Sequence, residues 1–297
     1  MAPIDENSVV PPPVTGDRPL KRVVSMTGAY GLRNYTVKDI QDLKGVRQLT
    51  QVNPVTPEEA AAAEEAGIDA IKMLMEPNAP QSAIDRRRAA PHTFMTYATR
   101  ITPYASKTEA LRAAFDAMEA GADSVMCQWS LEFVETVAKA GIPIEGHVGL
   151  VPRKSTWTGG LRPVGKTVDE AVQIYRDIKD LENAGAWCVE CELVPVPIMR
   201  ELSKRTSLVT SSIGSGSGGD LQLLFAVDIL GDGKPPFPRH AKQYCDLYAM
   251  RQEMQKVRVA AFKEYAEDVR SGAFPGPEHT VDVGQDVVDG FLEAIDK

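Results

Sequence analysis

Hydrophobic and polar positions alternate along the chain in a regular rhythm from about residue 34 onward. A short apolar run rich in β-forming residues is followed by a turn and then by a stretch with helical hydrophobic spacing. Several helical stretches end in Ala-Gly, as in EEAGID and MEAGADS, and glycine is the usual residue that terminates a helix. The pattern predicts strands at 46–52, 68–75, 92–98, 122–128, 142–148, 186–193, 207–213 and 224–230.

This repeat predicts an α/β protein. About eight strand–helix units without a seam favour a single (β/α)8 barrel of the TIM type over two domains. A doubly wound open sheet is the alternative, and the absence of a glycine fingerprint after the first strand weakens it. We expect an N-terminal arm at 1–33, a barrel domain at 34–283 that includes a long helical segment from about 240 to 271, and a C-terminal helical extension at 284–297.

Charge and cysteine content narrow the class of protein. The net charge of -8 argues against a nucleic-acid partner or an anionic membrane surface. No apolar run approaches the roughly 18 residues of a membrane span, and no secretory segment follows Met1. Four cysteines in 297 residues do not make a disulfide framework. We therefore expect a reduced, cytoplasmic protein.

Two carboxylates stand inside an apolar run at 186–196. A buried carboxylate costs several kcal/mol unless it is paired or protonated. In a strand, Glu190 and Glu192 share one face, and Glu192 lies at the carboxyl end of the sixth expected strand, where barrel active sites form. Glu192 is therefore a candidate catalytic residue. The alternative is a structural glutamate in a salt bridge at the barrel mouth.

Several spaced motifs resemble those of ketopantoate hydroxymethyltransferases. The resemblance covers roughly residues 34 to 283 and is strongest from 142 onward. The stretch TVKDIQDLKGVRQLT is similar to the lead-in to the family's first strand. The motifs that carry the resemblance, in chain order, are GHVGLVPRKSTWTGGLRPVGKT (146–167), ELVP (192–195), SSIGSGSGGDLQLLFAVDILG (211–231), FPRHAKQY (237–244) and SGAFPGPEH (271–279).

The resemblance implies a (β/α)8 barrel and an aldol reaction. In that family a one-carbon unit from methylenetetrahydrofolate is added to a branched 2-oxo acid, with Mg²⁺ held by carboxylates. The resemblance implies that Glu192 is the base that removes the proton. It also implies that His147 lies near the 2-oxo acid. A shielded, apolar setting suits a general base because burial can raise its pKa toward working pH.

The first half of the chain departs from the family at the metal ligands. The positions of the family's ligands fall on Met75, near Tyr97, and on Gln128. Mg²⁺ needs hard oxygen ligands, and sulfur side chains cannot replace them. We therefore expect no metal at these positions, or a site rebuilt around Glu76.

Without a metal, other groups must bind the substrate and stabilise an enolate. The candidates for substrate binding are His147, Glu76, Tyr97, Arg100, Gln128 and Lys166. Arg100 could clamp a carboxylate through its planar fork, although it could equally be a solvated loop residue. Lys72 is a further cation, but its offset from Met75 directs it toward the helix layer.

The residues leave more than one function open. The first hypothesis is an enzyme that makes or breaks a C–C bond next to a carbonyl, by aldol or retro-aldol chemistry, on a small molecule other than 3-methyl-2-oxobutanoate. A C–C lyase of the phosphoenolpyruvate mutase/isocitrate lyase type is a second. A non-catalytic barrel that binds a ligand or supports an assembly is a third. The family's rings and the apolar stripe of the last helix favour a homo-oligomer, a ring or a decamer.

Three further features have structural explanations. Cys188 and Cys191 lie three apart in an expected strand, so their thiols should point to opposite faces and be inert. The run GSGSGG (214–219) lacks the lysine of a P-loop and is expected to be a tight turn. The basic run RRRAAP (86–91) is expected to be a solvated helix end.

Overall fold

The chain divides into two compact units in a computed structural model that describes residues 19–100, 104–128 and 130–296. The first unit ends at Cys245, and the second spans Asp246–Lys297. The expected barrel domain was drawn through residue 283, so the barrel unit is shorter than the sequence suggested. The expected extension at 284–297 is only the last part of the second unit.

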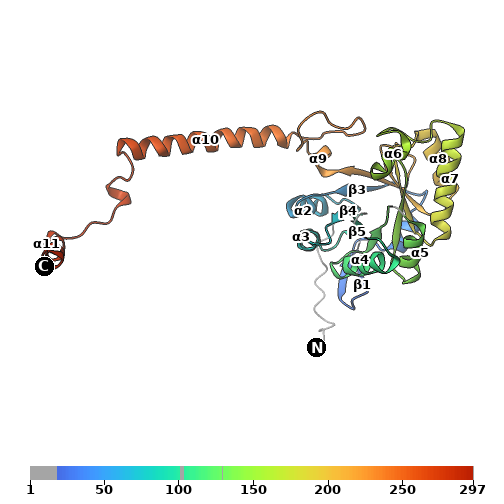
Figure 1. Ribbon diagram of the computed structural model, residues 1–297, viewed down its shortest axis with the longest axis horizontal. Coiled ribbons are helices and arrows are strands. Elements are labelled where there is room, and N and C mark those ends of the chain that lie inside the picture. Colours follow the sequence, from blue (N-terminus) through green and yellow to red (C-terminus); the bar gives the residue numbers. More distant parts are fainter. Residues whose placement is uncertain (1–18, 101–103, 129, 297) are drawn as a thin grey trace. The chain divides into compact units, whose positions relative to one another are not determined.

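Parallel strands close into an eight-stranded barrel in the first unit, in the order β10-β3-β4-β5-β6-β7-β8-β9 (Figure 1). Each neighbouring pair in this ring is parallel, so the predicted (β/α)8 fold is confirmed. The strands are β3 (Leu49–Asn53), β4 (Ala70–Met75), β5 (Phe94–Thr99), β6 (Ser124–Met126), β7 (Ile144–Gly149), β8 (Cys188–Glu192), β9 (Val209–Ile213) and β10 (Leu221–Phe225).

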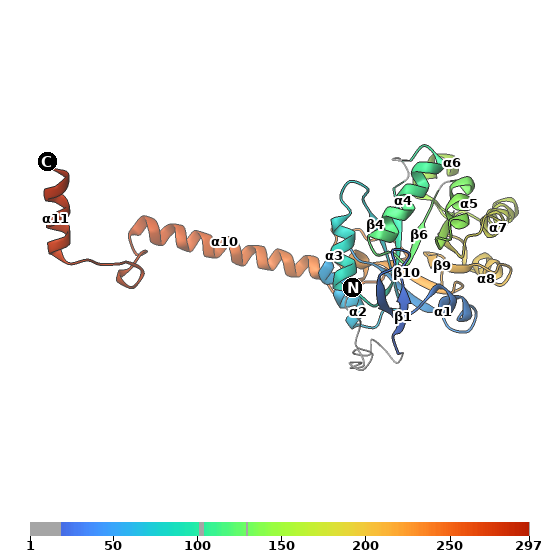
Figure 2. The same ribbon diagram turned by 90° about the horizontal axis from the view of Figure 1, so that it is seen from below.

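Helices surround the barrel, as the two views in Figures 1 and 2 show. After α2, α4, α5 and α7, a glycine with a φ of 76°, 101°, 82° and 89° respectively turns the chain into the next strand. This left-handed conformation is open to glycine at little cost, which explains the repeated Ala-Gly ends. The helices are α2 (Pro57–Glu65), α3 (Gln81–Ala89), α4 (Lys107–Glu119), α5 (Leu131–Lys139), α7 (Val168–Asn183) and α8 (Val196–Lys204).

The loops at the carboxyl ends of β7 and β9 differ from simple strand–helix turns. The segment after β7 contains a short 3₁₀ turn, η1 (Pro152–Lys154), and a single helical turn, α6 (Ser155–Thr158). The glycine-rich run 214–219 joins β9 directly to β10, as the expected tight turn. The last strand lies earlier than predicted, because Leu221 and Leu223 alternate inward and Ala226–Ile229 form the short helix α9.

The segment before the barrel closes its amino-terminal end. Residues 1–18 of the expected arm lie outside the described residues. Residues within 21–33 form an antiparallel hairpin that the sequence did not predict, β1 (Lys21–Val24) with β2 (Tyr30–Arg33), and α1 (Val37–Asp42) follows. The Asn34 side chain accepts the backbone N–H of Phe94 at 2.8 Å and donates to the Asp69 carbonyl at 2.9 Å. This amide therefore connects the segment before the barrel to the starts of β4 and β5.

Two arginines of the basic run are buried, so its interpretation as a solvated helix end was wrong. Arg86 donates to the carbonyls of Pro54 and Leu74, and Arg87 donates to those of Thr93 and Gly121. Both side chains donate to backbone carbonyls near strand ends. A buried carbonyl requires such a hydrogen-bond donor. Arg88 alone of the three remains in solvent.

The second unit contains a long helix, α10 (Leu247–Ser271), a 3₁₀ turn, η2 (Pro277–His279), and a shorter helix, α11 (Gln285–Ile295). The helix predicted from about 240 begins at residue 247, where Asp246 caps it by accepting the Ala249 N–H. None of the residues of these two helices is buried. Large apolar side chains are exposed on both, including Phe262, Phe291 and Ile295.

Candidate functional site

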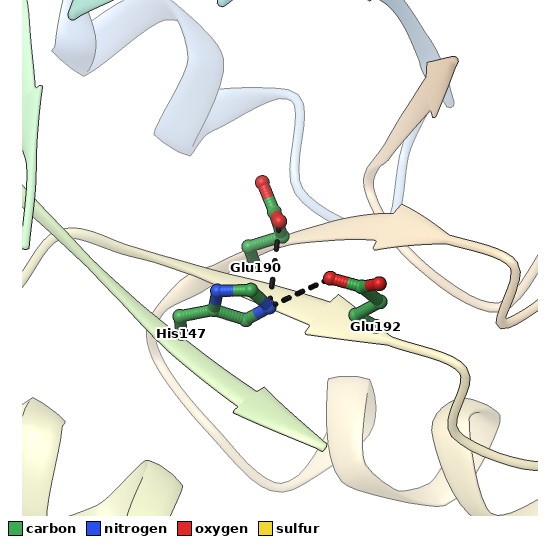
Figure 3. Close-up of side chains that lie close together, drawn as sticks. All are labelled: His147, Glu190 and Glu192. Carbon is green, nitrogen blue, oxygen red and sulfur yellow. Dashed lines mark ion pairs between the residues drawn. The ribbon is translucent and has the colours of Figure 1, made fainter. Parts of the chain in front are cut away.

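His147, Glu190 and Glu192 come together at the carboxyl ends of β7 and β8 (Figure 3). The two strands pair with His147 opposite Glu190, so alternation places all three side chains on the inner face of the barrel. The His147 Nε2 atom lies 3.2 Å from Glu192 Oε2 and 3.4 Å from Glu190 Oε1. The sequence prediction that Glu190 and Glu192 share a face agrees with this geometry.

Lys72 reaches this group from the other side of the barrel. Its Nζ atom lies 2.8 Å from Glu145 Oε2 and 2.8 Å from Glu190 Oε2, and its side chain is only 3% exposed. The expectation that Lys72 points into the helix layer was wrong. Lys72 pairs in register with Thr96, whose hydroxyl donates to Glu145 inside the barrel.

Burial and charge act in opposite directions on this ion pair. Burial alone would lower the pKa of Lys72, but the carboxylates of Glu145 and Glu190 raise it well above its ordinary value. Burial likewise pushes the pKa of Glu190 upward, and the charges of Lys72 and His147 outweigh it, so that the pKa is lowered. Lys72 therefore carries its proton and Glu190 is ionised at neutral pH.

The backbone around Glu192 is held tightly. Its carbonyl accepts the Leu150 N–H at 2.9 Å, and a Cβ on Gly149 would lie 2.3 Å from that same carbonyl oxygen. Gly149 also has a φ of 83°, so this position requires glycine. The next residue, Leu193, has a φ of 49°, a strained conformation of the kind that gathers at functional sites.

The His147 imidazole is buried beside an open cavity. Its side chain is 2% exposed, and neither ring nitrogen makes a hydrogen bond of good geometry within the described residues. The cavity measures about 690 Å³ and is bordered by His147, Cys127, Gln128, Gly149, residues of the loop after β7, and residues of helices α5 and α7. A buried polar atom without a partner is expensive, so a ligand in this cavity would find an unsatisfied ring to bind.

The other predicted site residues are distributed around the molecule. Gln128 lines the cavity with His147. Glu76 and Arg100, at the carboxyl ends of β4 and β5, pair with each other through both arms of the guanidinium at 2.5 Å. The fork expected to clamp a substrate carboxylate therefore holds a carboxylate of the chain itself.

Tyr97 and Lys166 lie away from this group. Tyr97 is fully buried on the outer face of β5, where its hydroxyl donates to the carbonyls of Ala83 and Ala120 in the helix layer. Lys166 is exposed and borders a groove between α7 and α8. The structure thus groups His147, Glu192 and Gln128, and separates them from Tyr97 and Lys166.

The residues at the positions predicted from the motifs for the metal ligands do not fit a magnesium ion. Met75 is buried in the same apolar cluster as Tyr97, between strands and helices, and Gln128 supplies only an amide. The only group of potential ligands found within the described residues is His147, Glu190 and Glu192, whose ligand atoms lie within 4.8 Å of one another. Lys72 already pairs with one of these carboxylates, so an ammonium group occupies part of the space that a cation would fill.

The two neighbouring thiols take no part in this chemistry. Cys188 belongs to the apolar cluster inside the barrel, and Cys191 belongs to the cluster between the barrel and its helices. The two thiols therefore lie on opposite faces of β8, as predicted. Burial raises the pKa of Cys191 to about 12, and it raises that of Cys188 well above its ordinary value. Both thiols are therefore protonated and unreactive at neutral pH.

Sequence reasoning missed the part of Lys72 and Glu145 in the site. Glu145 precedes His147 by two residues, so strand alternation alone placed both on one face of β7. Lys72 could have been placed inward by counting from Ala70 and Leu74 rather than from Met75. The alternation of β4 therefore placed Lys72 on the inner face. The prediction took Met75 as an inward residue, and this shift of one residue turned Lys72 toward the helices.

A closed parallel barrel whose acid–base residues gather at the carboxyl ends of its strands defines a (β/α)8 enzyme. The protein has no helix among its described residues that is long and apolar enough to span a membrane. The family model described as ketopantoate hydroxymethyltransferase matches residues 82–277, and the chain belongs to this family. The resemblance drawn from the motifs is thereby confirmed.

Named relatives agree with this assignment, and a solved structure shares the fold. The chain is 34% identical over 265 residues to a 3-methyl-2-oxobutanoate hydroxymethyltransferase of Thermus thermophilus, covering 82% of this chain and 98% of that protein. It is 32% identical over 273 residues to the enzyme of the same name from Pyrobaculum calidifontis, covering 83% and 98%. The carboxyl transferase domain of Rhizobium etli pyruvate carboxylase, at 10% identity and a TM-score of 0.50 over 73% of this chain and 48% of that one, shares the fold.

Proposed function

We propose that this enzyme makes or breaks a C–C bond next to a carbonyl by aldol or retro-aldol chemistry, on a substrate other than 3-methyl-2-oxobutanoate. The relatives named above carry out hydroxymethyl transfer, which supports the reaction class. The observation that carries the proposal is the contact of Glu192 with His147, whose ring borders the open cavity.

Glu192 is the proposed base. Its side chain is 16% exposed, so it can reach a substrate carbon while remaining shielded from bulk water. Glu192 would take the proton from the carbon next to the carbonyl, and the electron pair would move onto the carbonyl oxygen. The resulting enolate would then form a C–C bond to the carbon of formaldehyde as the C=O π bond of formaldehyde opens, and the new alkoxide would take the proton back from Glu192. With methylenetetrahydrofolate as the donor, water would first release formaldehyde and leave tetrahydrofolate. The retro-aldol direction reverses these steps.

Gln128 is the proposed donor for the developing oxyanion, and His147 is proposed to contact the substrate beside it. Both border the cavity, and the Gln128 amide offers N–H groups that could be directed at an oxygen. Methylenetetrahydrofolate is one candidate source of the one-carbon unit, as the family resemblance implies. A free aldehyde is the other, and a direct comparison of the two donors would identify which one the enzyme uses.

The lost ligand set supports a different substrate. On the predicted alignment, the family's chelating carboxylates correspond to Met75, Tyr97 and Gln128, and the Arg100 fork is occupied by Glu76. A 2-oxo acid that binds through a metal has no equivalent partner at those positions. We therefore propose a carbonyl substrate held by hydrogen bonds rather than by metal chelation, with Glu76, Arg100 and Lys166 outside its direct contacts.

The decisive experiment measures deuterium exchange at the carbon next to the carbonyl. The intact enzyme is incubated in D₂O with a panel of 2-oxo acids and aryl ketones, with and without EDTA. We expect exchange with at least one compound, and we expect the chelator to leave its rate unchanged. Exchange that EDTA abolishes and Mg²⁺ or Mn²⁺ restores would overturn the metal-free form of the proposal. Absence of exchange with every compound would instead favour a non-catalytic, ligand-binding barrel.

We also propose that the enzyme is a cytoplasmic homo-oligomer. No disulfide joins the four cysteines, all of which lie within the described residues, and this suits a reducing compartment. Helix α11 exposes Val287, Phe291, Leu292 and Ile295 at helical spacing, and such a stripe is normally covered. Light scattering of the full chain should give a mass well above 32.3 kDa, and a monomer at all concentrations would contradict the proposal.

A further inference from the structure

We propose that Lys72 is a positioning residue of this site: acting through Glu190, it holds the His147 ring in place between Glu190 and Glu192. The inference rests on the proposed function for its kinetic consequence, but its structural part can be tested without a substrate. Lys72 itself touches neither the cavity nor Glu192 in the described contacts. Its effect must therefore pass through the side chains that it binds.

The two oxygens of Glu190 have separate partners. Oε2 accepts a hydrogen bond from Lys72 at 2.8 Å, whereas Oε1 lies 3.4 Å from His147 Nε2. Because one oxygen is fixed by the ammonium, the carboxylate cannot rotate without breaking that bond. The position of the oxygen facing His147 is thus set by Lys72, a residue on the other side of the barrel.

Glu145 fixes the ammonium in turn. The Thr96 hydroxyl donates to Glu145 Oε1, and Glu145 Oε2 lies 2.8 Å from Lys72 Nζ. Both carboxylates are almost fully buried, with side chains 1% and 8% exposed. An ammonium held between two such groups has little freedom to move, since each displacement would lengthen one contact.

The charges explain why this support is needed. Three carboxylates, those of Glu145, Glu190 and Glu192, crowd around Lys72 and His147. Without the ammonium, Glu145 and Glu190 would be buried without a strong counter-charge, and Glu190 would take up a proton or turn away. His147 would then lose one of the two oxygens that face its Nε2 atom.

The consequence for His147 concerns which ring nitrogen carries the hydrogen. Two carboxylate oxygens within 3.4 Å of Nε2 favour a hydrogen on that atom. The other nitrogen, Nδ1, is buried and makes no hydrogen bond within the described residues, so it is the ring atom left for a ligand. Lys72 would thus determine how the ring presents itself to the cavity.

The test compares two lysines of the same barrel. Lys72→Met removes the central ammonium, and Lys44→Met removes the ammonium that pairs with Asp220 at the opposite end, at 2.9 Å. The imidazole ¹⁵N resonances of His147 are recorded on the intact protein and assigned with a His147→Asn variant. We expect Lys72→Met and Glu190→Gln to alter the His147 signals in the same way and Lys44→Met to leave them unchanged. Unchanged His147 signals in a folded Lys72→Met protein would overturn the proposal.

Kinetics provide the second readout. In the deuterium-exchange assay, Lys72→Met should lower kcat between about 10-fold and 100-fold with little change in KM, as groups that orient a site residue usually do. Adding Lys72→Met to Glu190→Gln should then cost little more, since the two act in series. Independent, multiplying losses would mean that Lys72 does not act through Glu190.

A further variant keeps the test available if Lys72→Met does not fold. Lys72→Met combined with Glu145→Leu removes one buried acid together with the ammonium, and apolar replacement of a buried ion pair is often tolerated. In this protein the His147 signals should still change, and unchanged signals would count against the proposal. Failure of the proposed function would appear differently, as absent exchange in the unaltered enzyme while the His147 signals still respond to Lys72.

Discussion

The carboxylates at the amino-terminal end of the barrel are bonded differently from Glu192 at the carboxyl end. At the amino-terminal end, Asp220 accepts the Thr210 and Gly45 N–H groups and pairs with Lys44, and Asp69 accepts from Thr50, Tyr35 and Arg47. At the carboxyl end, the only polar contact found for the Glu192 carboxylate within the described residues is the 3.2 Å approach to His147. The His147 ring itself lacks a hydrogen bond of good geometry within that part of the chain.

This difference separates stability from function within one fold. A buried acid with several donors stabilises the folded state and has no capacity left for a ligand. An acid and an imidazole with unmet hydrogen-bonding capacity cost stability and are available to a substrate. Substitutions at the two ends should therefore produce different kinds of loss.

The largest expected effect is on turnover at the carboxyl end. Glu192→Gln keeps the volume of the side chain and removes its basicity. We expect deuterium exchange to fall by roughly 100-fold to 10,000-fold, the usual contribution of a general base, with the melting temperature close to that of the unaltered enzyme. Normal melting with near-normal exchange would remove Glu192 from the mechanism. A loss of about 3–5 kcal/mol in unfolding free energy would instead identify a structural ion-pair partner.

The second effect is a displacement of Glu192 through its neighbour. Gly149→Ala places a methyl group 2.3 Å from the Glu192 carbonyl oxygen, at a φ of 83° that alanine disfavours. Because a shift of about 1 Å in a catalytic group can cost roughly 100-fold, exchange should fall by that order. Gly159→Ala is the matched control, since it also has a positive φ of 76° but nothing within 4 Å of the added carbon. Equal losses in the two variants would show that backbone strain, not contact with Glu192, is responsible.

The third effect should be confined to stability. Asp220→Asn replaces an acceptor of three or more donors with an amide that brings donors of its own. Chemical denaturation should show a loss of about 3 kcal/mol in unfolding free energy. The folded variant should retain its exchange rate, because Asp220 lies at the opposite end of the barrel from Glu192. A fall in the exchange rate without a fall in stability would contradict the assignment of stability to one end of the barrel and function to the other.

The smallest effect concerns acid stability. Burial pushes the pKa of Glu182 up, but the bonds from Lys179 and Ser207 outweigh it and lower the pKa to about 2. A carboxyl whose folded pKa lies below its ordinary 4.5 stabilises the protein above that pH, and this contribution is lost as the pH falls toward 2. Glu182→Gln should therefore flatten the decline of the melting temperature over this range and leave exchange unaltered. An unchanged acid profile would contradict the assignment.

Much of the fold could be read from the sequence because strand and helix periods recur so regularly. The Ala-Gly helix ends and the apolar runs located most strands to within a few residues, and the last strand was misplaced because the run 224–230 continues into the short helix α9. The hairpin β1–β2 was missed because its four-residue strands carry no clear alternation.

The candidate site was only partly predictable, for a physical reason. Local spacing placed Glu190 and Glu192 on one face of β8, and motif resemblance added His147. No local pattern could bring Lys72 to Glu190, because that contact depends on closing the ring of strands. Likewise, the burial of Arg86 depends on which carbonyls the neighbouring strand ends leave unpaired.

The Lys72–Glu190 contact also has a consequence for the order of folding. The two residues lie 118 positions apart in the sequence, on β4 and β8. Contacts of such long separation form late, because the chain must first be brought together at an entropic cost. A partly assembled sheet would leave Lys72 without its Glu190 partner, and the ion pair can form only once the intervening strands have joined. Formation of this pair therefore reports closure of the barrel, and with it the moment at which the site becomes complete.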